Sequence, residues 1–167
     1  MDLQQLKSLQ APLKERYRVD PPSATITLRA AAETSDEVTS QLTTGLGRVT
    51  AGLHPAAGGD GTLACPGDML LEALVACAGV TLRAVATGIG VFLRSARVTA
   101  EGDLDFRGTL GVAREVPVGF REIRLTFQLD TDASDEQRAT LIRLTERYCV
   151  VLRTLRDAPP IVVGEGV

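Results

Sequence analysis

The segment "PGDMLLEALVACAGVTLRAVATG", which begins at Pro66, constrains the fold more than any other part of the chain. It is apolar on nearly every side, and in a water-soluble protein a helix of that kind lies buried in the core. Pro66 and Asp68 suit a first helical turn, where proline loses no hydrogen bond and an acid faces the positive end of the helix dipole. We therefore predict a core helix from about Pro66 to Ala86 that stops near Gly88 or Gly90.

A membrane span is the alternative for this segment, and we reject it. Glu72 and Arg83 interrupt the apolar run, which falls short of the roughly 20 residues that a bilayer requires. The N-terminal "MDLQQLKSLQ" has no apolar stretch typical of a signal peptide. The net charge of −3 is spread along the chain, which argues against nucleic acid and anionic membranes as partners. We therefore expect a cytoplasmic protein.

The rest of the chain predicts an α+β domain with antiparallel sheets. Asp2 and Gln5 form a capping box for an N-terminal helix that Pro12 interrupts. Strand composition marks five further segments and a last one at the C-terminus, namely 23–30, 37–44, 47–55, 96–106, 120–130 and 161–167. The first three of these would form an antiparallel meander, and a second core helix would run from Ser134 to Leu155. We place an N-terminal helical segment at residues 1–20 and the main domain at residues 21–167.

Each predicted core helix carries one cysteine, Cys77 in the first and Cys149 in the second. The simplest interpretation is that both are buried small hydrophobes, because an apolar setting raises the pKa of a thiol and makes it inert. A zinc site is disfavoured, since the chain has no C-x-x-C motif and His54 is its only histidine. The third cysteine, Cys65, lies beside Pro66 at the start of a helix. We interpret it as an incidental loop residue; a reactive thiol whose pKa the helix dipole lowers is the alternative.

Two motifs together resemble a known family. "PGDMLLEALVACAGVTL" and "ERYCVVLRTL", each centred on a cysteine, look like the OsmC/Ohr family of thiol-dependent hydroperoxide reductases, and the resemblance extends from about Ser23 to Val163. It implies an intertwined homodimer in which Cys77 attacks the peroxide and Cys149 resolves the sulfenic acid as a disulfide. It also implies organic hydroperoxides as substrates, a dithiol such as dihydrolipoamide as reductant, and no metal or organic cofactor.

The sequence departs from the family's pattern around the thiol. Where the peroxidases have a glutamate that holds an activating arginine, this chain has Gly67, with Asp68 and Glu72 close by. Ten helical residues span roughly 15 Å, so an acid at the start of the helix can meet Cys77 only across a crossing helix of a partner chain. We expect Glu72 to be the catalytic acid, and Asp68 to bind substrate unless it serves only the helix dipole.

The activating arginine is also displaced. The family's arginine lies in a loop for which this chain has "AAETSDE", without any arginine. Arg48 is our first choice for a catalytic cation, and Arg29, Arg83 and Arg153 are further candidates. His54, in "GLHPAAGG", is a candidate pocket residue that binds substrate; a turn histidine without a chemical role is the alternative.

Three functions are compatible with these observations. The first is a homodimeric thiol peroxidase acting on organic hydroperoxides. The second is an OsmC-like binding or redox-sensing module without efficient turnover, since the displaced acid and the missing loop arginine remove the expected activation of the thiol. The third is a structural domain with inert cysteines.

Overall fold

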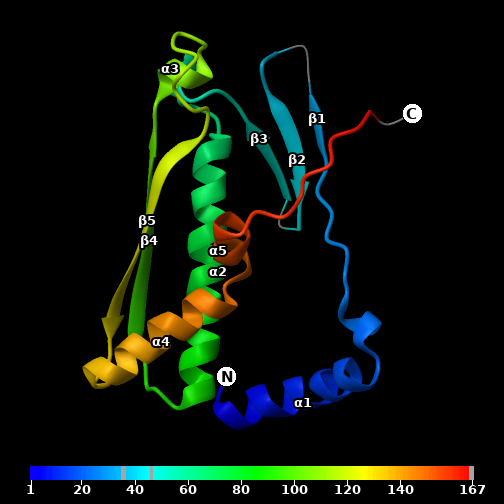
Figure 1. Ribbon diagram of the computed structural model, residues 1–167, viewed down its shortest axis with the longest axis vertical. Coiled ribbons are helices and arrows are strands. Elements are labelled where there is room, and N and C mark those ends of the chain that lie inside the picture. The colour runs from blue at the N-terminus through cyan, green and yellow to red at the C-terminus, as the bar shows by residue number, and fades with distance from the viewer. Residues whose placement is uncertain (35–36, 46, 166–167) are drawn as a thin grey trace. The chain divides into compact units, whose positions relative to one another are not determined.

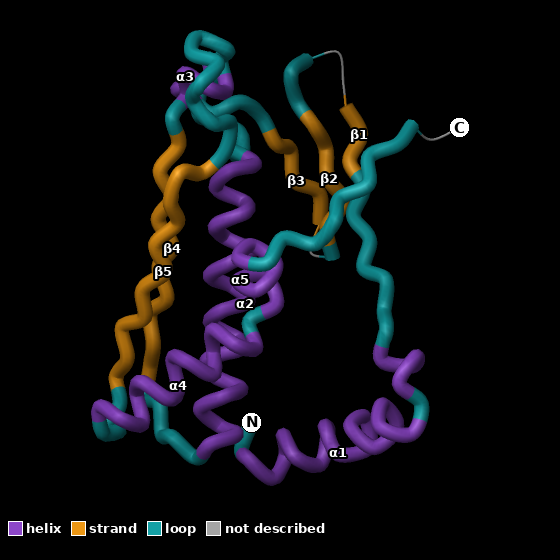
Figure 2. Tube along the Cα trace, in the orientation of Figure 1, coloured by secondary structure: helices purple, strands orange, loops and turns teal. Residues whose placement is uncertain are grey.

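The chain forms two compact units, each built from two separate stretches of sequence. The computed structural model describes residues 1–34, 37–45 and 47–165. The first unit comprises Met1–Glu72 and Ala100–Arg124, and the second comprises Ala73–Thr99 and Leu125–Val167. Figures 1 and 2 show the elements of both units. Helices and antiparallel strands occupy separate stretches, which confirms the α+β prediction.

The N-terminal helix α1 (Leu3–Val19) starts with the predicted capping box. The Gln5 backbone N–H donates to Asp2 Oδ1 over 2.8 Å, and the Asp2 backbone N–H donates to Gln5 Oε1 over 2.9 Å. Pro12 lies inside the helix, so the prediction that it interrupts the helix is wrong. Proline removes one helical hydrogen bond. Most of the surrounding residues are leucine, lysine, glutamine, glutamate or arginine, which favour the helix strongly enough to continue it. No residue of α1 is buried.

The first unit also contains a three-stranded antiparallel meander, of which the second and third strands overlap predicted segments. Strands β1 (Ala32–Thr34), β2 (Ser40–Thr44) and β3 (Gly47–Ala51) pair antiparallel in that order. The predicted strand at residues 23–30 is wrong, because Pro21–Ala24 forms a 3-10 helix and no strand follows before β1. Ile26 and Leu28 are 69% and 89% exposed, so their β-favouring side chains meet no packing surface. A segment with strand composition forms a strand only where a neighbouring strand completes its backbone hydrogen bonds.

Three long elements contribute residues to both units. Helix α2 runs from Pro66 to Ile89 and ends at Gly90, which has a φ of 74° that suits glycine, so the predicted core helix and its stop are confirmed. Strands β4 (Ser95–Leu104) and β5 (Phe120–Asp130) form a two-stranded sheet and confirm two further predictions. The short helix α3 (Phe106–Thr109) lies between them in sequence and was not predicted.

The core of the second unit forms around one stripe of α2. The buried residues of α2 recur every fourth position, as Leu74, Ala78, Leu82 and Ala86. Leu82 and Ala86 pack with Leu141 of helix α4 (Asp135–Tyr148) and with Val91 and Leu93. The other faces of α2 are more open, and Val80 is 73% exposed. The expectation of a helix buried on all sides is therefore wrong for the single chain.

Helix α2 also has the length and composition of a membrane span. Among the described residues it is the one helix that meets both criteria. Within its most apolar stretch of 18 residues, 22% is buried in the protein. Because the helix continues through the glycines and through Glu72 and Arg83, the short uninterrupted apolar run does not exclude a membrane span by length.

The second predicted core helix is divided in two. Helix α4 ends at Tyr148, helix α5 runs from Val150 to Arg156, and Cys149 between them has extended backbone angles, φ −73° and ψ 108°. Ser134 and Gln137 form the predicted capping box of α4. The predicted last strand is wrong as far as residue 165, where the chain has no regular structure; residues 166–167 lie outside the described part.

Candidate thiol site

Cys77 and Cys149 lie next to each other in the second unit. Cys77 is on the middle turns of α2 and is half-buried, whereas Cys149 is fully buried at the junction of α4 and α5. Both cysteines are free thiols, and a direct side-chain interaction between them shifts the pKa of each. The packing of the two helical segments therefore brings together the two thiols that the sequence singled out.

The surroundings of Cys77 favour its thiolate. Burial raises the pKa of the Cys77 thiol, but the backbone N–H of Val151, the Cys149 thiol, the Val150 N–H and the Thr81 hydroxyl each lower it. The net pKa of Cys77 lies below the ordinary thiol value. All of these groups are uncharged, so the thiolate is stabilised by dipoles and not by a cation.

The surroundings of Cys149 have the opposite effect. Burial raises its pKa, the nearby Cys77 raises it further, and the backbone N–H groups of Leu152 and Val151 oppose this only in part. The pKa of Cys149 is therefore above the ordinary thiol value. The two adjacent thiols therefore differ in acidity, and Cys77 loses its proton more readily than Cys149 does.

The break at Cys149 provides the N–H donors for this site. In a continuous helix the N–H groups of Val150 and Val151 would be used by carbonyl oxygens four residues earlier. Because α5 begins anew at Val150, its first N–H groups have no such partner and remain available to the sulfur atoms. Sequence reasoning missed this arrangement. Its signal was the Val150–Val151 pair, since consecutive β-branched residues disfavour helix continuation.

Thr81 is the other residue that sequence reasoning missed. It follows Cys77 by four positions and therefore lies on the same face of α2, where its hydroxyl reaches the Cys77 sulfur. The i,i+4 spacing from Cys77 was the available signal.

The predicted charged residues lie elsewhere. Glu72, Asp68, Arg48 and Arg29 belong to the first unit and are exposed, whereas both cysteines belong to the second unit. The structure therefore does not group these residues with the thiol pair inside one unit.

The two arginines that share the second unit with the cysteines have other partners. Arg83 donates a hydrogen bond to the carbonyl oxygen of Leu93. Arg153 forms an ion pair with Asp157. Each guanidinium therefore already binds another group of the protein, and neither contact involves a cysteine.

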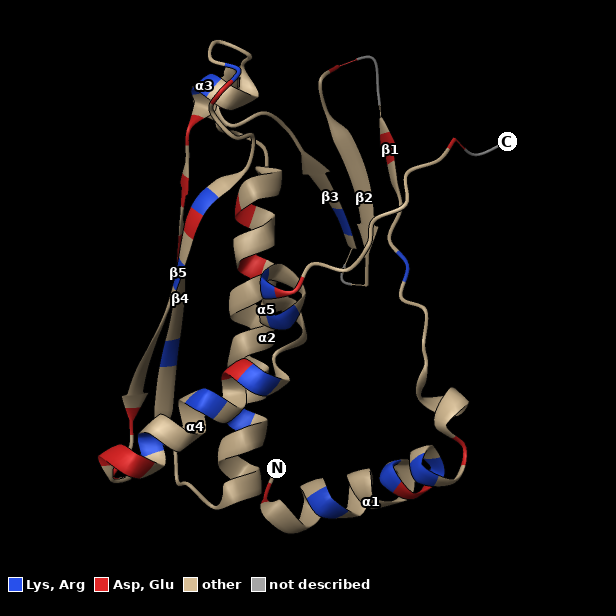
Figure 3. Cartoon of the chain, viewed as in Figure 1, with Lys and Arg blue, Asp and Glu red and all other residues tan. Residues whose placement is uncertain are grey.

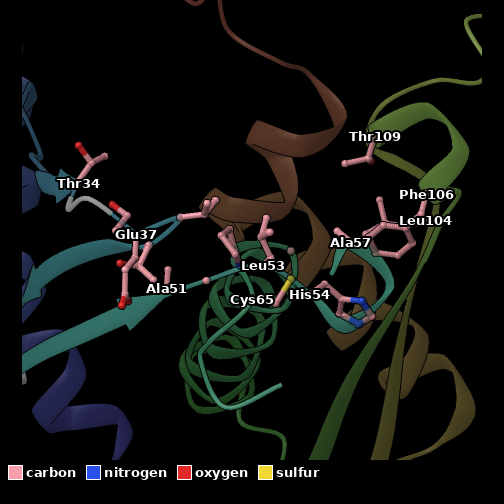
Figure 4. Close-up of a pocket in the computed structure, with 16 residues that line it drawn as sticks. Thr34, Glu37, Ala51, Leu53, His54, Ala57, Cys65, Leu104, Phe106 and Thr109 are labelled. Atoms are coloured by element: carbon pink, nitrogen blue, oxygen red, sulfur yellow. The ribbon is translucent and has the colours of Figure 1, made fainter. Parts of the chain in front are cut away.

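The third cysteine lines an apolar cavity of about 470 Å³ in the first unit. Figure 4 shows the side chains around it, among them Cys65, His54 and Phe106. The His54 ring stacks on Phe106 with 5.0 Å between ring centroids and 21° between the planes. The backbone N–H of Ala56 donates to His54 Nδ1 over 3.0 Å, so Nε2 is the ring nitrogen that remains to donate a hydrogen bond. His54 thus offers a donor among the residues that line this apolar cavity.

The two predicted substrate-binding residues line a second cavity of about 350 Å³. His54 and Asp68 both border it, as does Cys65. A Cβ at Gly67 would lie 3.6 Å from the Cys65 sulfur and from the Phe120 ring. A longer side chain at this position would extend into the space that these residues surround. Glycine therefore leaves open a volume that a glutamate would reduce.

Metal-ligand side chains do not cluster in the described part of the chain. Nowhere in residues 1–34, 37–45 and 47–165 do three His, Cys, Asp or Glu side chains come together in an arrangement suited to a metal ion.

The fold and the thiol site define an α+β protein with two central helical segments that carry a cysteine pair. A family model described as "OsmC-like protein" matches residues 59–164, which is more than half of the chain. The chain therefore belongs to the OsmC family, as the two cysteine motifs indicated. The N-terminal helix α1 precedes the matched region. No curated protein sequence matches the chain.

Solved structures show the same fold at low sequence identity. An OsmC-like protein from Mycoplasma pneumoniae has a TM-score of 0.67 and 18% identity over 80% of this chain and 89% of its own. An organic hydroperoxide resistance protein OsmC from Legionella pneumophila has a TM-score of 0.62 and 21% identity over 80% and 91%. An organic hydroperoxide resistance protein from Elizabethkingia anophelis has a TM-score of 0.63 and 15% identity over 80% and 92%.

Proposed function

We propose that this protein is a thiol peroxidase that reduces organic hydroperoxides. The observation that carries the proposal is the Cys77–Cys149 pair, in which a thiol of lowered pKa adjoins a thiol of raised pKa. A thiolate is the reactive form of cysteine, and a neighbouring protonated thiol is suited to resolve the oxidised product. The names of two structural neighbours, both organic hydroperoxide resistance proteins, support the same reaction class.

The reaction would proceed in three balanced steps. The Cys77 thiolate attacks the distal oxygen of the hydroperoxide, the O–O bond breaks, and the alcohol leaves after taking up a proton. Cys77 is now a sulfenic acid, and the Cys149 sulfur displaces its hydroxyl group as water to form the Cys77–Cys149 disulfide. A dithiol such as dihydrolipoamide then reduces the disulfide by thiol–disulfide exchange and is itself oxidised to a disulfide. We place this cycle in the cytoplasm.

The surroundings of the thiol support an organic substrate over hydrogen peroxide. Apolar side chains line most of the core around α2, and Cys149 itself has no exposed surface. An apolar site gains free energy from an alkyl or aryl group but offers little to replace the hydration of a small polar peroxide.

We further propose a homodimer in which a second copy covers the exposed apolar face of α2. Val80 is 73% exposed although it lies in the middle of this helix. A solvent-exposed apolar face on a long helix is costly, and covering it with the same face of another copy removes it from water. With this face covered, we place the protein in solution without a membrane as partner, and the net charge of −3 argues against nucleic acid.

A homodimer would also give the displaced charges a role. Glu72 precedes Cys77 by five residues, which turns the helix by about 140° beyond one full turn, so its carboxylate cannot face the sulfur of its own chain. In a dimer, Glu72 and Arg48 of one copy would act on the Cys77 of the other. In the same arrangement we propose His54 and Asp68, which share a cavity, as residues that bind the substrate.

The second candidate function is a redox-sensing or binding module without efficient turnover. The observation that favours it is the absence of a cation among the groups that lower the pKa of Cys77. A thiolate stabilised by dipoles alone can be oxidised once without the rapid turnover that a nearby guanidinium would support.

Turnover measurements with the full-length reduced protein distinguish these functions. Cumene hydroperoxide and hydrogen peroxide would be supplied separately with dihydrolipoamide, and peroxide consumption would be followed with time. A peroxidase consumes cumene hydroperoxide faster, loses this activity with Cys77→Ser and keeps it with Cys65→Ser. Oxidation of one equivalent without recycling would favour the sensing module, and no oxidation of Cys77 would contradict both.

A further inference from the structure

Four arginines surround one cavity at the junction of α4 and α5. Arg143 and Arg147 of α4 and Arg153 and Arg156 of α5 line a space of about 430 Å³ together with Glu146. Figure 3 shows basic segments on both helices close to this junction. All four arginines are exposed, so a solute can reach them.

The break at Cys149 brings these side chains together. Arg143 and Arg147 are four residues apart and share one face of α4, and Arg153 and Arg156 are three apart and share one face of α5. In one continuous helix the thirteen residue-to-residue steps from Arg143 to Arg156 would span roughly 20 Å. Because the chain changes direction between the two helices, both arginine pairs border the same cavity.

Only half of this positive charge is neutralised within the protein. Glu146 pairs with Arg156 over 2.9 Å, and Asp157 pairs with Arg153. In the part of the chain that the structure describes, no carboxylate is within ion-pair distance of Arg143 or Arg147. The Arg147 guanidinium instead lies over the Tyr148 ring, 5.4 Å from its centroid.

This grouping does not result from general basicity. The whole chain has a net charge of −3, with 18 basic and 21 acidic residues. Like charges four residues apart on a helix repel each other, so Arg143 and Arg147 contribute nothing favourable to α4 by their proximity. An anion in contact with both guanidinium groups would offset this repulsion.

We propose that this cavity binds an oligophosphate group, either as inorganic oligophosphate or as the phosphate chain of a nucleotide. Guanidinium groups form paired hydrogen bonds with phosphate oxygens in a geometry that ammonium groups do not match. The cavity has two arginines held in place by carboxylates and two that have no carboxylate partner in the described chain. A ligand with at least two adjacent phosphates matches this set. A single small anion would contact only part of the set.

Calorimetric titration of the reduced full-length protein tests this site. Tripolyphosphate and ATP would be titrated separately at low salt, with sulfate at equal ionic strength as a comparison. We expect tripolyphosphate to bind more tightly than sulfate, and Arg143→Gln/Arg147→Gln to weaken binding at least about tenfold, since charged hydrogen bonds are lost. Equal affinities for tripolyphosphate and ATP would identify the phosphate chain as the ligand; tighter ATP binding would identify a nucleotide.

A matched variant controls for the loss of positive charge. Arg97→Gln/Arg114→Gln removes two exposed arginines outside the cavity and should leave the affinity unchanged. The proposal is overturned if tripolyphosphate does not bind at millimolar concentration, if Arg143→Gln/Arg147→Gln binds as tightly as the original protein, or if the control variant weakens binding to the same extent. Near-identical melting temperatures would show that all variants are folded, because every substituted residue is on the surface.

Discussion

Cys77 and Cys149 are direct neighbours in the folded protein, and their shared surroundings shift their pKa values in opposite directions. Cys77 lies on a continuous helix, whereas Cys149 lies where the chain leaves one helix and begins another. The asymmetry follows from this difference. The first N–H groups after the break stabilise the thiolate of Cys77, and the complete burial of Cys149 disfavours its own.

The lowered pKa of Cys77 predicts selective alkylation. Limited treatment with iodoacetamide across a pH series should modify Cys77 with a midpoint below the ordinary thiol value. Thr81→Val removes a hydroxyl that lowers this pKa and should move the midpoint upward, whereas Thr87→Val, two turns further from Cys77, should not. Peptide mass spectrometry gives the rate at each cysteine. A midpoint at or above the ordinary value in the original protein would contradict the assignment of Cys77 as the nucleophile.

Removal of the second thiol should trap the oxidised first one. In Cys149→Ser the Cys77 sulfenic acid has no neighbouring thiol with which to condense, so one equivalent of cumene hydroperoxide should leave a product that dimedone labels at Cys77. The original protein should instead show a Cys77–Cys149 disulfide and little labelling. Cys65→Ser should behave as the original protein does. Dimedone labelling at Cys65 in place of Cys77 would contradict the proposed order of reaction.

The stripe of α2 that forms the core should dominate stability. Leu82 is 1% exposed and packs against Leu141 and its neighbours, so Leu82→Ala should lower the free energy of unfolding by about 3 kcal/mol. The same substitution at Leu110, which is 56% exposed, should cost less than about 0.5 kcal/mol. Urea denaturation followed by circular dichroism measures both values. Similar losses for the two variants would contradict the described core.

The exposed face of α2 should determine the oligomeric state. Val80→Arg places a charge in the middle of the face that we propose a second copy covers, and it should convert a dimer into a monomer at micromolar concentration. Sedimentation velocity measures the change directly. Phe92→Arg, at a position 73% exposed beyond the end of α2, serves as a control that should leave the dimer intact. A monomer already in the original protein would remove the cross-chain roles of Glu72 and Arg48.

Acid should weaken the capping of α3 through Asp105. Hydrogen bonds from the Arg107 side chain and backbone N–H lower the pKa of Asp105 to about 2. Because the folded-state pKa is depressed, this carboxylate stabilises the fold fully above about pH 4, and the contribution is lost as the pH falls towards 2. Asp105→Asn should therefore have a lower Tm than the original protein at pH 7, and the gap should close as the pH approaches 2.

Asp20→Asn is the control for the acid experiment. Asp20 lies at the end of α1, far from α3 in sequence, whereas Asp105 is the residue that caps α3. Its Tm should follow that of the original protein at every pH. A gap between Asp105→Asn and the original protein that stays constant from pH 7 to 2 would contradict an ionisation effect.

Local chemistry was sufficient to predict most elements. Residues close in sequence determine both capping boxes, the end of α2 at Gly90 and the strands β4 and β5. Capping residues and the alternation of apolar and polar side chains therefore located these elements. The two cysteine motifs were likewise sufficient to indicate the family that the comparison confirmed.

The tertiary structure alone decided which segments with strand composition become strands and where the second core helix breaks. Residues 23–30 carry β-favouring side chains but lack a strand partner within the described chain, and pairing is a non-local interaction that composition does not encode. At Cys149 the helix is interrupted, which frees the N–H groups of Val150 and Val151 for the Cys77 sulfur, more than 70 positions away in sequence. The sequence thus singled out Cys77 and Cys149, and only packing determined the directions of their pKa shifts, because a pKa depends on the atoms that surround a group in space.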